Sequence, residues 1–229
     1  MSKNILITGC SSGLGLALTN YYLDKDYKVY GISRNKPDIN NKNFVFHSFD
    51  LSNISLIKMQ LNDFISSIKD IHIAYLNAGM LGEIKELSKL GIEEMQRVYE
   101  LNVYSNKELL DILATINTTN IIALSSGASK NASKGWASYS LSKAGLNMLV
   151  SLYSKELLNT KVIALAPGVI QTPMTDYIRQ EIDDDIFTSA KVLKAGIIQK
   201  PSEAAKKIDE FIKRVDEFES GSFVDIREI

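Results

Sequence analysis

The sequence predicts an α/β protein, with a doubly wound parallel sheet that helices cover on both faces. Short apolar segments alternate with helical patterns, the first segment runs into a glycine-rich turn, and small or polar residues follow several segments directly. Alternating strands and helices are typical of such a sheet. With 229 residues and 45% hydrophobic content, the chain can bury one substantial core. We therefore predict a single domain over residues 1–229.

The composition excludes several classes of function. A formal net charge of −1 provides no basic field for nucleic acid or for an anionic membrane surface. No run approaches the ~18 apolar residues of a membrane span, and no signal-peptide apolar region follows Met1. The single cysteine, Cys10, excludes an intrachain disulfide and suits a reducing compartment. We expect a cytoplasmic protein that binds neither nucleic acid nor membranes.

The first predicted strand and helix flank the glycine-rich turn. Residues 4–8 form an apolar run typical of a buried strand, the sequence Gly9-Cys-Ser-Ser-Gly13-Leu-Gly15 follows, and a helical pattern begins after Gly13. Glycines let the backbone approach a pyrophosphate, and the helix N-terminus supplies N–H groups and a partial positive charge. This order of elements predicts a dinucleotide site.

The end of the second predicted strand, residues 28–33, indicates which dinucleotide is bound. An acidic residue there would accept the ribose 2′-hydroxyl of NAD, whereas a cation would pair with the 2′-phosphate of NADP. Arg34 follows this strand, which favours NADP with Arg34 as the phosphate clamp. The alternative is a solvated loop arginine.

The later segments continue the alternation. We predict strands at 44–49, 71–76, 120–125, 161–166 and 222–226, and helices at 54–68, 92–113, around 139–143, and 202–218. The loosely patterned segment at about 172–200 is interpreted as an irregular lid over the substrate. Its acidic run at 183–185 lacks further ligands, so no metal site is predicted. Structural roles are expected for His47 and His72.

Four predicted strand ends converge on one edge of the sheet. Gly9, Asn77, Ser126 and Gly168 each follow a strand, and ligands of parallel sheets bind outside the carboxyl ends of the strands. We therefore expect the site at this edge.

Tyr139 and Lys143 are four residues apart, about one helical turn, so both side chains project from one face. A positive charge beside a phenol lowers its pKa from ~10, which makes the phenol usable as an acid or base. The alternative is a surface tyrosine beside a solvated lysine. Asn102, in the middle of a predicted helix, is disfavoured there by propensity, and we expect a role for it.

Taken together, the motifs of this chain resemble those of the short-chain dehydrogenases/reductases, in the same order. The motifs are Thr8-Gly-x-x-x-Gly-x-Gly15, Asn77-Ala-Gly79, Asn102, Ser126, Tyr139-x-x-x-Lys143 and Pro167-Gly-x-x-x-Thr172. The resemblance implies a Rossmann-type sheet of seven strands, and hydride transfer between a nicotinamide and a carbonyl or alcohol. It also implies a homodimer or homotetramer packed through the helices that carry Asn102 and Tyr139.

The same resemblance implies roles for individual residues. Tyr139 would donate the proton, Ser126 would hold the carbonyl oxygen, and Lys143 would lower the phenol's pKa and hold the nicotinamide ribose, while Asn102 would support a water that relays protons to the lysine. Residues implied to line the cofactor, besides Tyr139, Lys143 and Arg34, are Gly9, Ser11, Ser12, Gly13, Leu14, Gly15, Asp50, Leu51, Asn77, Ala78, Gly79, Pro167, Gly168, Ile170 and Thr172.

A narrower likeness concerns the substrate side. Lys134-Gly-Trp136-Ala-Ser-Tyr139, Thr172-x-Met174 and Ser220-Gly-x-x-Val-Asp225 resemble the sepiapterin reductase branch and the bacterial benzil reductases akin to it. This likeness implies that Asp225 anchors the substrate, although an aspartate in a last strand can equally be structural. We assign an apolar substrate wall to Trp136, Met174 and Ile178, with core or surface packing as the alternative.

The predicted function is therefore NADPH-dependent reduction of a ketone or α-dicarbonyl, with a benzil- or sepiapterin-like small molecule as the partner. Two alternatives stay open. One is an NAD-dependent alcohol dehydrogenase, against which Arg34 argues. The other is a non-catalytic dinucleotide sensor, which would not need the complete set of Asn102, Ser126, Tyr139 and Lys143.

Overall fold

The computed structural model describes residues 3–229 and is organised around one sheet. Its seven strands have the order β3-β2-β1-β4-β5-β6-β7, and every neighbouring pair is parallel. Their bounds are Asn4–Thr8 (β1), Lys28–Ser33 (β2), Phe44–Ser48 (β3), Asp70–Leu76 (β4), Asn117–Leu124 (β5), Lys161–Ala166 (β6) and Phe223–Asp225 (β7). The sheet confirms the predicted single-domain Rossmann-like fold.

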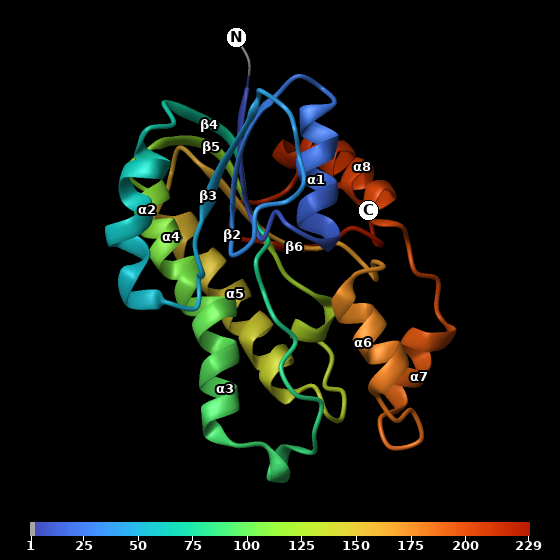
Figure 1. Cartoon of the computed structure of the whole chain (residues 1–229). Coiled ribbons are helices and arrows are strands. Elements are labelled where there is room, and N and C mark those ends of the chain that lie inside the picture. The colour runs from blue at the N-terminus through green and yellow to red at the C-terminus, as the bar shows by residue number, and fades with distance from the viewer. Residues whose placement is uncertain (1–2) are drawn as a thin grey trace.

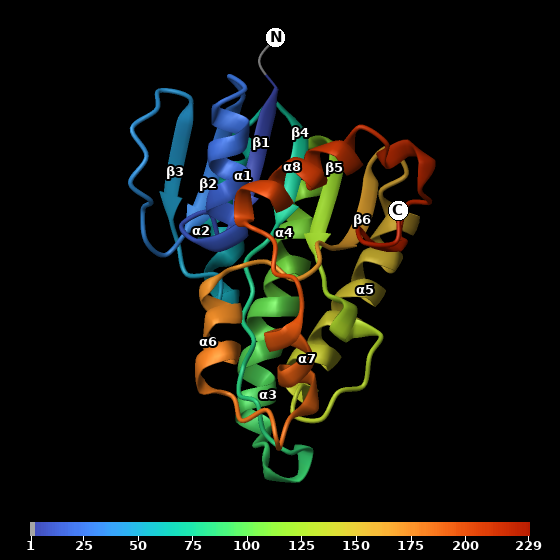
Figure 2. The ribbon, with the colours of Figure 1, turned by 90° about the vertical axis from the view of Figure 1, so that its right-hand side faces the viewer.

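Helices cover both faces of the sheet (Figure 1). Their bounds are Gly13–Leu23 (α1), Ile57–Ser66 (α2), Ile92–Tyr99 (α3), Ser105–Leu113 (α4), Ala137–Glu156 (α5), Pro173–Glu181 (α6), Thr188–Ala195 (α7) and Pro201–Ile212 (α8). One core cluster packs α1 and α8 on one face, and a second packs α2, α4 and α5 on the other. Figure 2 shows the labelled strand arrows pointing toward α6 and α7, so these two helices lie beyond the carboxyl ends of the strands.

Strand β1 illustrates why the strands are almost continuously apolar. Ile5, Leu6 and Ile7 are all fully buried. Ile5 and Ile7 belong to the cluster with α1 and α8, whereas Leu6 belongs to the opposite cluster. Because successive side chains point to opposite faces, a sheet covered on both faces needs apolar residues at every position.

The helix predicted at 92–113 has these bounds in the structure, but it is not a uniform α-helix. A π-helical turn over Glu100–Tyr104 separates α3 from α4. Asn102 lies in this turn, where its amide donates to Met80 O and Ser142 Oγ, both at 2.9 Å, and accepts from Met80 N at 2.8 Å. Single π turns inside helices often occur at functional sites. The asparagine therefore ties the helix to the loop that follows β4.

Other boundaries also differ from the predictions. The segment at 172–200 is not irregular, because it contains α6 and α7. Thr172 caps the start of α6: its hydroxyl accepts from Thr175 N at 3.3 Å, and Pro173 is the first helical residue. The helix predicted at 202–218 ends at Ile212. The helix predicted at 54–68 begins as a 3₁₀ turn, and β5 starts at Asn117 because it pairs there with Asp70.

Within residues 3–229, no helix has the length and apolarity needed to cross a membrane. The same residues contain no group of three or more His, Cys, Asp or Glu side chains arranged to hold a metal ion. His47 stacks on Phe64 with 4.8 Å between ring centroids, and His72 Nε2 lies 3.1 Å from Lys3 Nζ. Both histidines thus have packing or surface partners.

Candidate active site

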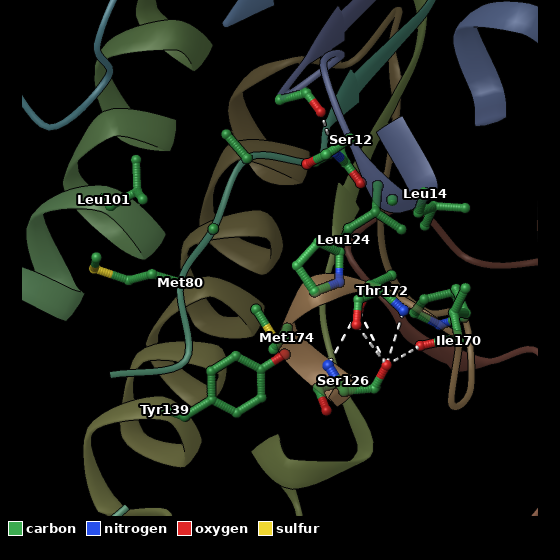
Figure 3. Close-up of a pocket in the computed structure, with 18 of the residues that line it drawn as sticks. Ser12, Leu14, Met80, Leu101, Leu124, Ser126, Tyr139, Ile170, Thr172 and Met174 are labelled. Atoms are coloured by element: carbon green, nitrogen blue, oxygen red, sulfur yellow. Dashed lines mark hydrogen bonds between the residues drawn. The ribbon is translucent and has the colours of Figure 1, made fainter. Parts of the chain in front are cut away.

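A cavity of about 580 Å³ opens at the carboxyl ends of the strands. It is lined by every predicted cofactor residue except Gly15, by Ser126, Tyr139 and Lys143, and by Trp136, Met174 and Ile178. Figure 3 shows that these side chains converge from separate elements, with Tyr139 pointing from α5 toward Met174 and Ser126. The residues singled out from the sequence therefore come together at one place.

The glycine-rich turn has a backbone that only glycines adopt readily. Gly9 and Gly13 have φ values of 68° and 51°, in the left-handed region. A Cβ on Gly15 would collide with the carbonyl oxygen of Gly9, so Gly15 shapes the turn although it does not line the cavity. Asn77 Nδ2 donates to Thr8 O at 2.9 Å and Gly9 O at 3.3 Å, which fixes the turn against the end of β4.

The N-terminus of α1 is open toward the cavity. Ser12 is the N-cap residue, but its side chain makes no capping hydrogen bond, and the first turn contains no acidic residue. Ser12, Gly13 and Leu14 line the cavity. The first N–H groups of a helix have no intrahelical partner and favour an anion. The turn thus has the donors and the space that a dinucleotide pyrophosphate requires.

Arg34 and Asp50 lie at the far end of the cavity, after β2 and β3. The Arg34 side chain is exposed and forms no ion pair within residues 3–229, and the Arg34 backbone oxygen accepts from Ser48 Oγ at 2.8 Å. Asp50 Oδ1 accepts from Ser52 N at 3.0 Å and Ser52 Oγ at 2.8 Å, in a local turn. The guanidinium is therefore available for an anionic ligand.

Lys143 is buried, and its side chain forms part of the cavity lining. Its ammonium donates to Leu124 O at 2.7 Å and lies 5.7 Å from the centroid of the Tyr139 ring. Burial lowers the pKa of Lys143 to about 8. A Cβ on Gly79 would lie 3.1 Å from Asn102 Oδ1 and 3.5 Å from Lys143 Nζ, so Asn102 approaches the lysine across Gly79 without lining the cavity itself.

The sequence predicted that Lys143 lowers the pKa of Tyr139. In the protein without a cofactor the pKa is raised instead, so this prediction was wrong. Burial raises the pKa of the phenol above its usual value, and the Ser126 hydroxyl opposes that rise in part. The Lys143 ammonium faces the ring and is itself disfavoured by burial, so it does not reverse the effect. The phenol accordingly remains protonated at neutral pH.

The predicted substrate wall belongs to a small apolar cluster beside Tyr139. Its buried members are Leu81, Ile84, Trp136, Ile178, Ile182, Phe187 and Ala190, and Tyr139, Met174 and Leu193 pack against them. Trp136 donates from Nε1 to Ser189 Oγ on α7 at 2.5 Å, and its ring centroid is 6.2 Å from that of Tyr139. Trp136, the N-cap residue of α5, therefore links α5 to α7 as well as lining the cavity.

Asp225 is the predicted substrate residue that the structure does not bring to the cavity. Its buried carboxylate accepts from the Arg227 backbone N at 3.0 Å and from Nε at 2.9 Å, and it pairs with Nη2. The Arg227 guanidinium lowers the pKa of this carboxyl. Arg227 was not among the predicted site residues. Its position two residues after Asp225 was the available signal that this carboxylate has a local partner.

The cavity and its backbone turn agree with a comparison of the whole sequence. Residues 3–183 match the model of the short chain dehydrogenase family. The chain belongs to this family. A benzil reductase ((S)-benzoin forming) of Bacillus subtilis (strain 168) is 32% identical over 240 residues, which cover 97% of this chain and 98% of the relative. A benzil reductase ((S)-benzoin forming) of Bacillus cereus is 28% identical, covering 99% and 100%.

Solved structures of other proteins share the fold. A short chain dehydrogenase/reductase from Saccharomyces cerevisiae superposes with a TM-score of 0.85 at 24% identity, covering 98% of this chain and 96% of its own. The structure of ElxO with NADP bound gives a TM-score of 0.80 at 21% identity, covering 99% and 97%.

Several lining residues of this short-chain dehydrogenase were not predicted. Met80 follows the Asn77-Ala-Gly79 motif directly, Leu101 precedes Asn102, and Arg97 lies one helical turn earlier. Their proximity to motif residues was the available signal. Leu193 had no such signal, because α7 reaches the cavity only through tertiary packing.

Proposed function

We propose that this protein is an NADPH-dependent carbonyl reductase that transfers a hydride to a ketone or α-dicarbonyl such as benzil. The observation that carries the proposal is the convergence of Ser126, Tyr139 and Lys143 on the cavity that also contains the glycine-rich turn. The two benzil reductases, which match over nearly the whole chain, support the substrate class.

The residues of the cavity fit a nicotinamide dinucleotide. The open N-terminus of α1 would take the pyrophosphate, and the bound nicotinamide would supply the hydride. Arg34 supports NADP over NAD, because its guanidinium has no ionic partner within residues 3–229 and could pair with a 2′-phosphate. Asp50, in a different local turn, offers Arg34 no competing salt bridge.

Tyr139 is proposed as the proton donor to the carbonyl oxygen. Its raised pKa keeps the phenol protonated at neutral pH, which a general acid requires. The Ser126 hydroxyl would donate a hydrogen bond to the same oxygen as negative charge develops on it. With a pKa of about 8, Lys143 can exchange protons near neutral pH, and its ammonium lies 5.7 Å from the centroid of the Tyr139 ring, so a proton would return to the tyrosine through a bound water or cofactor hydroxyl.

Asn102 is proposed to act by position in this reaction. Both hydrogens of its amide group are already donated to Met80 O and Ser142 Oγ. Its Oδ1 accepts from Met80 N and keeps one further lone pair near Lys143. That lone pair could hold the relay water expected from the sequence.

The substrate half of the cavity favours a flat apolar molecule. Trp136, Met174 and Leu193 contribute apolar surface beside Tyr139. A pterin would need a polar anchor such as Asp225, but that carboxylate is paired with Arg227. We therefore favour an aryl dicarbonyl over a pterin.

The proposal is tested by following NADPH absorbance with purified protein and a panel of benzil, sepiapterin and simple aryl ketones. We expect oxidation of NADPH with benzil, slower oxidation with aryl ketones, and none with sepiapterin. Faster oxidation of alcohols with NAD⁺ as the hydride acceptor would favour an NAD-dependent alcohol dehydrogenase. Tight NADPH binding without oxidation by any carbonyl would favour a dinucleotide sensor.

A further inference from the structure

An arginine, Arg227, follows the last strand at the edge of the sheet where the carboxyl ends of the strands form the proposed active site. Strand β7 pairs with β6, with Asp225 opposite Ala166, and Ile226 N donates to Ala166 O at 3.0 Å. Arg227 follows immediately. Because β6 lies between β7 and β5, a side chain from Arg227 that crosses the end of β6 can reach the loop after β5.

Asp225 fixes the direction of this arginine. The carboxylate side chain is only 4% exposed and binds Nε and Nη2 of Arg227 together, while the Arg227 side chain is 56% exposed. A planar guanidinium held at two nitrogens by one carboxylate has a defined orientation. The Arg227 side chain therefore has a fixed orientation, although one side of it faces water.

The Arg227 side chain passes over two glycines. A Cβ on Gly168 would lie 3.4 Å from Arg227 Cδ and 3.5 Å from Cγ, and a Cβ on Gly127 would lie 3.1 Å from Nη2. The stem thus crosses the loop after β6 and the guanidinium lies against the loop after β5. The absence of a side chain at Gly127 leaves the space for the guanidinium, while the stem lies at ordinary contact distance from Gly168.

Each glycine is next to a residue of the proposed reaction. Gly127 follows Ser126, and this loop is joined by its own hydrogen bonds: the Ser126 backbone oxygen accepts from Ser129 Oγ at 2.7 Å, and Ser126 Oγ accepts from Ala128 N at 3.2 Å. Gly168 follows Pro167, whose oxygen accepts from Gln199 Nε2 at 2.6 Å. The loop after β6 is thus held between Gln199 and Arg227.

We propose that Arg227, oriented by Asp225, is a positioning residue that holds the Ser126 loop and the Pro167–Gly168 loop in fixed relation. Ser126 then remains in place relative to a cofactor bound beside Pro167. The catalytic consequence rests on the proposed function, whereas the ordering of the two loops does not.

The first test measures loop order without any reaction. Hydrogen–deuterium exchange is compared for the wild type, Arg227→Ala and Arg227→Lys, at peptides that cover residues 125–131 and 167–172. Arg214→Ala is the matched control, since Arg214 pairs with Glu217 through Nε and Nη2 but lines no part of the cavity. We expect exchange in both peptides to rise at least about threefold in the Arg227 variants and to stay unchanged in Arg214→Ala.

The second test measures turnover of benzil. We expect kcat of Arg227→Lys to fall roughly tenfold, because small misplacements of reacting groups are costly, while KM for benzil stays within about threefold. Arg227→Lys keeps a cation beside Asp225, so its Tm should stay near that of the wild type, which separates positioning from folding. Wild-type exchange in both loops of both Arg227 variants would overturn the inference, as would wild-type kcat. A wild-type protein that reduces no carbonyl, but whose Arg227 variants still loosen both loops, would contradict the proposed function alone.

Discussion

The two halves of the cavity are built in different ways. The dinucleotide half is made of backbone: left-handed glycines at 9 and 13, and an Asn77 amide bonded to Thr8 O and Gly9 O. The substrate half is made of apolar side chains from distant segments, such as Trp136 and Phe187. Hydrogen bonds and φ angles fix position sharply, whereas apolar packing is non-directional. The first half therefore specifies one ligand class, and the second can be adapted to many.

This comparison ranks the expected effects of mutation. Changes to polar groups at the centre of the cavity should be severe, changes to Arg34 should act on one cofactor only, and changes in the apolar cluster should be graded.

The largest effect is expected for Tyr139→Phe. Loss of the proton donor should lower kcat for benzil reduction by roughly 10²- to 10⁴-fold, while the Kd for NADPH, measured by fluorescence, stays within about threefold. Tyr153→Phe is the control, because Tyr153 lies on the same helix but its hydroxyl donates to Asp111 outside the cavity. A Tyr139→Phe variant with the wild-type rate would sink the assignment of this residue.

Arg34→Ala should come next. Loss of one charge-assisted contact, worth about 1.5–3 kcal/mol, should weaken NADPH binding by roughly 10- to 100-fold and leave NADH binding almost unchanged. Titration of both cofactors against the wild type and the variant gives the result, with NADH as the internal control. Equal losses for NADPH and NADH would mean that Arg34 does not contact a 2′-phosphate.

Because Lys143 is buried, we expect the free energy of unfolding to depend on pH. Its pKa is about 8 in the folded protein against 10.5 as its ordinary value, so between these pH values the unfolded chain binds more protons and the free energy of unfolding rises with pH. The whole effect amounts to at most about 3 kcal/mol. We expect Lys143→Met to be more stable than the wild type at pH 7, with the difference shrinking from pH 8 to 10. Urea unfolding across this range is the measurement; a constant difference would contradict the prediction.

The smallest effect is expected for Trp136→Phe. The variant keeps an aromatic ring but loses the hydrogen bond to Ser189, worth about 1 kcal/mol, so KM for benzil should rise roughly fivefold with kcat little changed. Ser189→Ala removes the same hydrogen bond and should raise KM by the same factor. The double variant should have a KM no higher than that of either single variant. Additive losses in the double variant would show that Trp136 does not act through α7.

The contrast also explains what could be predicted from the sequence. The strand, turn and helix around Gly9 and Gly13 were placed correctly, because the restraints on them are local. A role for Asn102 was expected from its poor helix propensity, but the π-helical turn could not be predicted, because Met80 and Ser142 meet this residue only in the folded chain. The same is true of the raised Tyr139 pKa, which depends on burial.

The substrate half was predicted less well. The start signal of α6, Thr172 followed by Pro173, was present in the sequence and was overlooked, whereas α7 has no side-chain cap and packs around Phe187. Asp225 was assigned to the substrate by likeness, whereas its nearest partner is Arg227. Motifs thus identify the reaction chemistry, while tertiary contacts decide which molecule enters.

The central claim is that this cavity passes a hydride from NADPH to a carbonyl carbon. The direct measurement uses NADPH deuterated at the transferable C4 position, with benzil as substrate and mass spectrometry of the product. We expect benzoin that carries one deuterium at the carbinol carbon, formed in equal amount to the NADPH consumed, and at least about 100-fold less of it per unit time with Tyr139→Phe. Benzoin without deuterium, or NADPH consumed without benzoin, would contradict it.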